Sequence, residues 1–227
     1  MVLRKLLSSS YLLMRACSSL SILPNRLRAK AHFLECCSTA AWPFCFSARE
    51  FKSLARELEA LGEVVRATVY QAVLIPPIYG WPRFDVTLLV QTTSPEVIAE
   101  VQSSETYRRL NTDFVMSARN TRRIGDTEKS RSGTFLFNHF TAEDPEGAVG
   151  VWENLAVWYT SKTGVDNSTL LQPIGEAPYA FVNYVRLPRG PVRFLLDQLT
   201  KPSFHTFVRA TLRANDMVAM PLLCEPV

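Results

Sequence analysis

The stretch "GTFLFNHFTAEDPEGAVGVWENLAVWY", residues 133–159, contains the change of hydrophobic period that decides the fold. Its first part, 134–142, is rich in aromatic residues, which predicts a β-strand. The pattern then breaks at Asp144 and Pro145, and apolar residues recur at helical spacing up to Gly164. Asp is a favoured helix N-cap, Pro suits the first helical position and Gly ends helices, so a strand followed by a helix is predicted.

The residues after this helix complete a recognisable unit. Strands are predicted at 168–174 and 179–187, on either side of the turn "GEAP". A helix is predicted at 190–215 with a break near Pro202, and a closing strand at 216–227. The order β-α-β-β-α-β is that of a ferredoxin-like unit.

The preceding part of the chain repeats this order. The predicted elements are a strand at 31–40, a helix at 47–62, strands at 63–74 and 83–92, a helix at 94–111 and a strand at 113–120. Ser47 and Glu50 fit a capping box at the start of the first of these helices. We therefore expect an α+β fold of tandem ferredoxin-like units. Helices cover one face of each sheet, so packing the two bare faces together would give an eight-stranded barrel with helices outside.

Two boundaries are expected in the chain. A charged segment without apolar periodicity, 122–132, predicts an exposed linker between a first half at 31–121 and a second half at 133–227. Residues 1–30 are predicted to be a separate, cleavable targeting segment. Limited proteolysis is expected to begin in the linker.

The composition of residues 1–30 is typical of a mitochondrial transit peptide. The segment is rich in Arg, Ser and Leu, and it holds six of the 25 Lys and Arg residues but none of the 21 acids. Mitochondrial location is therefore predicted, with cleavage between about Pro24 and His32. A secretory signal is the alternative, with "LLSSSYLLM" as its short apolar segment.

The charge and cysteine patterns exclude several classes of function. Residues 31–227 have 19 basic and 21 acidic residues, which gives no basic surface for nucleic acid. No apolar run reaches the length of about 18 residues that suggests a membrane span. The five cysteines form no C-x-x-C motif, and no zinc-type spacing of His and Cys occurs, so no metal site is expected.

The segments "RFDVTLLVQTTSPEVIAEVQSSETYRRL" and "FLFNHFTAEDPEGAVGVWENLAVWY", with "YAFVNYVRLP" and "KPSFHTFV", resemble the dimeric α/β-barrel superfamily. This superfamily includes antibiotic-biosynthesis-type monooxygenases, haem-degrading monooxygenases, EthD-like proteins and tandem proteins of the chlorite-dismutase type. The resemblance covers almost all of residues 31–227 and implies an intramolecular barrel. It implies haem as one candidate cofactor, although the residues themselves identify none.

The resemblance also implies site residues. Its monooxygenases place an Asn on the first strand and a His on the second helix, which corresponds to Asn138 and His205 as catalytic candidates. They also place a Trp on a later strand, where this chain has Asn183 and Tyr184 instead. These two residues and Trp152 are the candidate substrate-binding residues. If Asn138 points into the barrel, His139 points to the helices, because neighbours on a strand face opposite ways.

Two classes of function remain open from the sequence. The first is a small-molecule-binding or monooxygenase-like protein with an apolar ligand near Asn138, Asn183 and His205, which predicts a roomy cavity with polar lining. The second is a non-catalytic barrel that serves as an accessory subunit of a mitochondrial complex, which predicts a filled barrel and an apolar outer patch. Each candidate residue also has a structural explanation, since a buried Asn bonded to backbone, a packed helical His and a core Trp are common.

Overall fold

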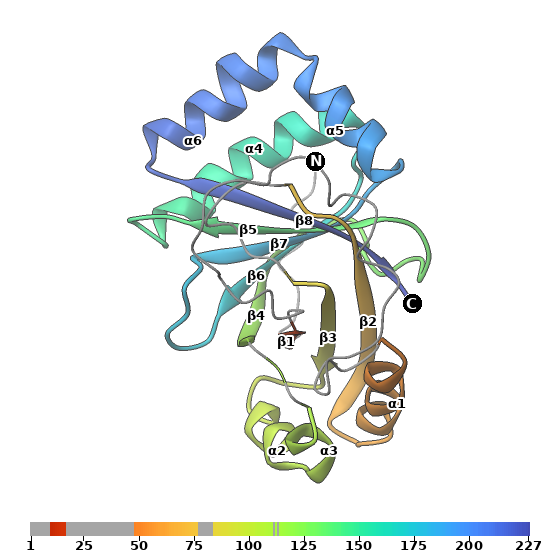
Figure 1. Ribbon diagram of the computed structural model, residues 1–227. Coiled ribbons are helices and arrows are strands. Elements are labelled where there is room, and N and C mark those ends of the chain that lie inside the picture. Colours follow the sequence, from red (N-terminus) through yellow and green to blue (C-terminus); the bar gives the residue numbers. More distant parts are fainter. Residues whose placement is uncertain (1–9, 17–47, 77–83, 111, 113) are drawn as a thin grey trace, which may run out of the picture.

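The structure, a computed structural model, describes residues 10–16, 48–76, 84–110, 112 and 114–227. Within these residues, eight antiparallel strands close into a single barrel, with helices outside it (Figure 1). The strand order around the barrel is β1-β3-β2-β8-β5-β7-β6-β4. No helix of this part of the chain is both long and apolar enough to cross a membrane.

Each half contributes four strands and the helices that cover them. The first half consists of β1 (Ser10–Ala16), α1 (Ala48–Glu59), β2 (Val64–Leu74), β3 (Val86–Thr92), α2 (Ile98–Ser103), α3 (Glu105–Arg108) and β4 (Phe114–Ile124). The second half consists of β5 (Phe135–Thr141), α4 (Gly147–Thr163), β6 (Ser168–Pro173), β7 (Phe181–Arg186), α5 (Pro191–Leu199), the π-helix η1 (Phe204–Arg209), α6 (Ala210–Ala214) and β8 (Val218–Pro226).

The topology confirms the prediction of a tandem barrel. The strand orders β4-β1-β3-β2 and β6-β7-β5-β8 are both ferredoxin-like, and the halves join where β2 pairs with β8 and β4 pairs with β6. The local signals of the second half also hold. The Asp144 carboxylate accepts a hydrogen bond from the Gly147 N–H at the start of α4, and Gly164 ends this helix with φ of 76°.

The first barrel strand lies earlier in the chain than the sequence indicated. β1 pairs with β3 on one side and with β4 on the other. Its side chains Tyr11 and Leu12 are 1% and 0% exposed. The strand expected at 31–40 lies outside the described residues. The segment predicted to be a removable leader therefore includes a strand that closes the barrel.

Aromatic and aliphatic side chains fill the barrel interior. The buried residues of this cluster are Tyr11, Leu13, Tyr70, Phe84, Leu89, Met116, Ala118, Phe135, Phe137, Leu171, Val182, Tyr184, Leu222 and Cys224. The rings of Phe137 and Tyr184 stack with their centroids 5.0 Å apart. The interior therefore forms a core that joins both halves.

The segment between the halves is more closely packed than an exposed linker. β4 extends to Ile124, so the predicted linker 122–132 begins inside a strand. Thr127 is fully buried, and its hydroxyl lies 3.1 Å from that of Thr169 on β6. The prediction of a wholly exposed segment is wrong for these residues.

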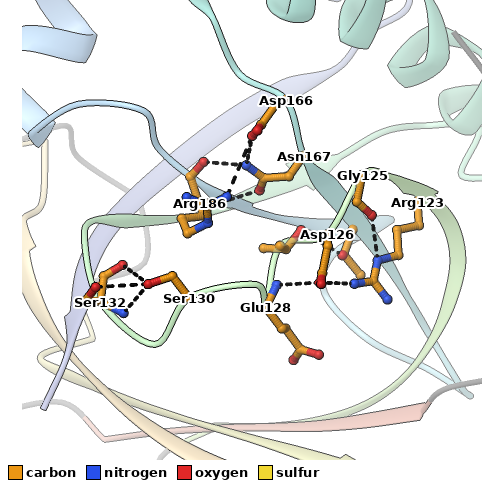
Figure 2. A network of polar contacts seen from close by, with 11 residues as sticks. Arg123, Gly125, Asp126, Glu128, Ser130, Ser132, Asp166, Asn167 and Arg186 are labelled. Atoms are coloured by element: carbon orange, nitrogen blue, oxygen red, sulfur yellow. Dashed lines mark hydrogen bonds and ion pairs between the residues drawn. The ribbon is translucent and has the colours of Figure 1, made fainter.

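Local hydrogen bonds shape the turn that follows β4, as Figure 2 shows. The Arg123 side chain donates to the Gly125 carbonyl oxygen over 3.0 Å and pairs with the Asp126 carboxylate. That carboxylate also accepts a hydrogen bond of 3.0 Å from the Glu128 N–H. The turn is therefore held by an Asx-type arrangement, in which an Asp side chain bonds the backbone two residues further on.

Candidate functional site

A cavity lies between the outer face of the second-half sheet and the helices that cover it. The space open to the centre of a water molecule is about 50 Å³, enough for roughly four ordered waters. The lining residues are Ile124, Leu136, Asn138, Phe140, Trp152, Leu155, Ala156, Tyr159, Thr160, Val165, Ser168, Asn183, Val185, Phe194, Val208, Leu212 and Ala219. Most of these are apolar, as is usual for small-molecule sites.

The sheet side of the cavity carries a polar floor formed by Asn138, Ser168 and Asn183. Asn138 on β5 and Asn183 on β7 are directly opposite each other in the strand register, so their Cβ atoms lie about 5 Å apart. The Ser168 hydroxyl donates to the Asn183 Oδ1 over 2.5 Å. The Asn138 Oδ1 is buried and has no hydrogen-bond partner in the described structure. An unpaired amide oxygen in such a place is costly unless water or a ligand binds it.

The helix side of the cavity is mainly apolar and carries no charged side chain among the described residues. Trp152 and Ala156 of α4 line it, and Val208 of η1 and Leu212 of α6 close it from the opposite side. Among the described lining residues, Tyr159 is the only one with an acid–base group, since no Asp, Glu, Lys, Arg, His or Cys lines the cavity. Burial raises the pKa of the Tyr159 phenol above its usual value, so it stays neutral. The site therefore favours a neutral ligand.

The structure brings together three of the residues predicted from sequence, Asn138, Asn183 and Trp152. It reverses the orientation considered for β5. Asn138 points to the helix layer, and His139 points into the barrel, where it is fully buried and its Nδ1 lies 3.0 Å from the Met220 carbonyl oxygen. The site depends on this orientation, because the barrel interior is filled.

Two further residues predicted from the sequence, Tyr184 and His205, do not line this cavity. Tyr184 follows Asn183 on β7 and so faces the barrel interior, where its hydroxyl bonds that of Tyr70. His205 is exposed on η1, with its Nε2 2.8 Å from the Leu199 carbonyl oxygen. The helix break after Leu199 explains the position of His205, because it turns this side chain back towards the preceding helix.

Ser168 is the member of the polar floor that sequence reasoning missed. It begins β6, and a Ser at a strand end resembles an ordinary turn residue. Leu170 pairs with Asn183 across the sheet. Ser168 lies two residues before Leu170 and therefore on the same face, and this spacing is the signal that could have identified Ser168. That signal requires the register of β6 against β7, which the long connection between these strands does not reveal.

The cavity does not fit haem, the candidate cofactor that the family resemblance implies. Haem iron is usually held by His, Cys, Met or Tyr. No His, Cys or Met lines the described cavity, and Tyr159 donates a hydrogen bond to Gln198. A cavity of this volume is also too small for a four-ring macrocycle. In addition, no group of three or more His, Cys, Asp or Glu residues in the described part of the chain could hold a metal ion.

Among the described residues, the face beneath the helices of the first half holds the buried Ser10 and Thr92 but no pair of amide side chains. Its sheet packs on α1 and α2 through aliphatic residues and one Phe. The buried members of this cluster are Leu12, Phe51, Leu54, Ala55, Leu58, Val64, Ala67, Val69, Val86, Leu88, Val90, Ile98, Val101 and Leu110. The two halves share a topology but differ in what lies between sheet and helices, which assigns the candidate site to the second half.

Comparison with solved structures supports the assignment of the fold as a tandem barrel. An anthrone oxidase-like protein matches with a TM-score of 0.57 and 10% sequence identity, over 96% of this chain and 90% of that chain. The chain has the dimeric α/β-barrel fold. A candidate monooxygenase from Fusobacterium nucleatum subsp. nucleatum ATCC 25586 matches this barrel with a TM-score of 0.52 and 6% identity, over 96% of this chain and 91% of that one.

At these identities the likeness concerns the fold alone, since one fold hosts many functions. No family model matches the barrel, and no curated protein matches it in sequence. The function of the barrel therefore has to be argued from its own cavity.

Proposed function

We propose that the barrel binds a small, neutral, mainly apolar molecule in the second-half cavity, as a monooxygenase-like protein of the mitochondrion. The observation that carries the proposal is the buried Asn138 Oδ1, which has no partner in the described structure and lies in a mainly apolar cavity. An apolar pocket with a few fixed polar groups is the usual form of a small-molecule site.

The chemistry that the lining supplies is hydrogen bonding. Side-chain amides can hold a carbonyl oxygen and stabilise negative charge that develops on it, which is the role proposed here for Asn138 and Asn183. The described lining provides no ionised acid or base to move a proton. The proposal therefore assigns binding and orientation of the ligand to this chain, and the ligand itself has to be reactive if oxygenation follows.

Blocking the cavity tests the proposal. Toluene, phenol and indole, each neutral and small, are titrated into the full chain by calorimetry, with ligand-detected NMR for weak binders. Ala156→Leu adds apolar atoms where Ala156 lines the cavity and should abolish binding. Val157→Leu is the matched control, because Val157 is 53% exposed on the other side of α4. If no compound binds the wild type, or if Ala156→Leu binds as the wild type does, the proposal is wrong.

Mitochondrial location is a part of this proposal that rests on the composition of residues 1–30. Since β1 occupies residues 10–16, the proposal requires that this strand remain in the mature protein. Import into isolated mitochondria, followed by N-terminal sequencing of the protected product, tests both points. Failure of import would remove the mitochondrial part and leave the ligand site untouched.

A second candidate function has its own supporting observation. Val192, Leu196 and Leu199 on α5 are 60%, 58% and 48% exposed, and their spacing places them along one side of the helix. Together with the filled barrel interior, this apolar strip fits an accessory subunit that docks through α5. Native co-purification from mitochondria should then lose a stoichiometric partner on Leu196→Lys but not on Ala156→Leu.

A further inference from the structure

We infer that the cavity selects ligands carrying a hydrogen-bond donor next to an acceptor, as in a ring lactam or a primary amide, and that Ser168 sets this preference by fixing the Asn183 amide. The inference rests on the proposed function, because it concerns the same cavity. It adds the chemical class of the ligand and a positioning residue.

The orientation of Asn183 follows from its contact with Ser168. A hydroxyl that donates to Oδ1 over 2.5 Å leaves the other end of the same amide, the Nδ2, pointing away from the serine. The Nδ2 has two hydrogens and no acceptor among the described residues. Ser168 is 4% exposed, so water does not compete freely for its hydroxyl. Asn183 therefore presents a donor to the cavity.

Asn138 supplies the complementary group. Its Oδ1 is buried and has no partner in the described structure, so it presents an acceptor. Because Asn138 and Asn183 are direct cross-strand partners on the same face of the sheet, the donor and the acceptor lie side by side. A ligand that satisfies both needs its own acceptor and donor on neighbouring atoms.

The remaining lining narrows the ligand class further. No charged side chain is present among the described lining residues, so a carboxylate or an ammonium ion would be desolvated without a counter-charge. The free volume of about 50 Å³ suits a ligand of about one ring. These features together point to a neutral, single-ring lactam or amide, or to a larger molecule that presents such a group.

Three probes of nearly equal size separate the contributions of the ligand's hydrogen-bond donor, its acceptor and its apolar ring. 2-Pyridone has the paired N–H and C=O, N-methyl-2-pyridone lacks the donor, and toluene lacks both groups. Calorimetric titration of the full-length wild type should show 2-pyridone bound about tenfold more tightly than N-methyl-2-pyridone, which corresponds to about 1.4 kcal/mol. Benzoate should bind at least tenfold more weakly than benzamide, since a buried anion finds no partner.

Variants then assign the preference to named atoms. Asn138→Leu keeps the branched shape of the side chain but removes its polar atoms, so it should bring the two pyridones to equal affinity. Ser168→Ala frees the Asn183 amide and should reduce the preference for 2-pyridone. Ser168→Thr keeps the hydroxyl on a residue that suits a strand and should restore the preference. A merely structural role of Ser168 would change toluene affinity as well, and Thr would not restore the ratio.

The outcomes separate this inference from the proposed function. Equal binding of all three probes by the wild type would overturn the inference while the cavity as a ligand site stands. A preference that survives both Asn138→Leu and Ser168→Ala would also overturn it. Absence of binding by every probe would overturn the inference and the proposed function together.

Discussion

The hydroxyl groups of Tyr70 and Tyr184 lie 2.6 Å apart inside the barrel, and the two residues come from different halves of the chain. Burial raises the pKa of both phenols well above the usual value, so each stays neutral and one donates to the other. Their rings pack edge to face, with centroids 6.1 Å apart. This pair is therefore a polar contact that links the two ferredoxin-like units within an apolar core.

The first prediction concerns this pair. Tyr184→Phe should lower the free energy of unfolding by about 1–3 kcal/mol, because it leaves the Tyr70 hydroxyl buried without its partner. In the double variant, adding Tyr70→Phe to Tyr184→Phe should lower the free energy of unfolding by far less than either single substitution does. The reason is that the second substitution removes the hydroxyl that the first left without a partner. Urea denaturation of both single variants and the double variant gives the coupling. Additive losses would show that the two hydroxyls do not depend on each other.

The topology could be predicted from sequence because each strand and helix is specified by residues close to it in the chain. The second half is an example of such local specification. The aromatic content of 134–142 and the stop at Gly164 each act within a few residues, and both are confirmed, while the Asp144 carboxylate bonds the Gly147 N–H at the start of α4, whose N-cap is Glu146. β1 could not be predicted in the same way. Its seven residues lie in an Arg-, Ser- and Leu-rich segment whose composition equally fits a targeting peptide.

The second prediction is that β1 is indispensable for the closed barrel. A chain that lacks residues 1–16 should lose its cooperative melt and aggregate, because the edges of β3 and β4 would be left unpaired. A chain that lacks only 1–9 keeps β1 and is the control. Leu12→Ala, at a fully buried position, should cost about 2–5 kcal/mol. Size-exclusion chromatography and thermal melts by circular dichroism distinguish these outcomes.

This prediction bears on processing of the N-terminus. Cleavage between Pro24 and His32, which the leader composition suggests, would cut the covalent link between β1 and α1. A soluble, monomeric and cooperatively folded chain beginning at residue 31 would show that the barrel does not need β1. It would also restore the simple interpretation of residues 1–30 as a removable leader.

The third prediction concerns the turn after β4, shown in Figure 2. Gly125 has φ of +55°, and a Cβ at this position would collide with the Asp166 carbonyl oxygen. Gly125→Ala should therefore destabilise the protein by more than about 1 kcal/mol, from backbone strain and this collision together. Gly62→Ala is the control, because no atom lies within 4 Å of its added Cβ and its φ needs no glycine. Equal melting temperatures of the two variants would contradict the prediction.

The candidate site was harder to predict than the topology, because it depends on register. Asn138 and Asn183 were identified from their strands, but which face of each strand meets the helices follows from how eight strands close. A one-residue shift exchanges Asn138 with His139 and Asn183 with Tyr184. The register therefore decides that Asn138 and Asn183 face the helices while Tyr184 faces the barrel interior.

The fourth prediction is a pH dependence of stability that arises from Glu128. Burial of this side chain raises the pKa of its carboxyl above 4.5, and the Arg66 guanidinium 4.0 Å away offsets the rise only in part. The folded state therefore holds this proton more tightly than the unfolded state does. The stability that results is fully present below about pH 4.5 and is lost as pH rises through the raised pKa.

Glu128→Gln should reveal this dependence, because glutamine stays neutral throughout. The difference in unfolding free energy, variant minus wild type, should increase from about pH 4 upward and level off above the folded-state pKa. Arg66→Gln should act in the opposite sense, since removing the cation leaves the buried carboxylate with less compensation and deepens the loss at neutral pH. Urea midpoints of the three proteins between about pH 4 and pH 8 test both trends. A constant difference between Glu128→Gln and the wild type would mean that Glu128 does not control the pH response.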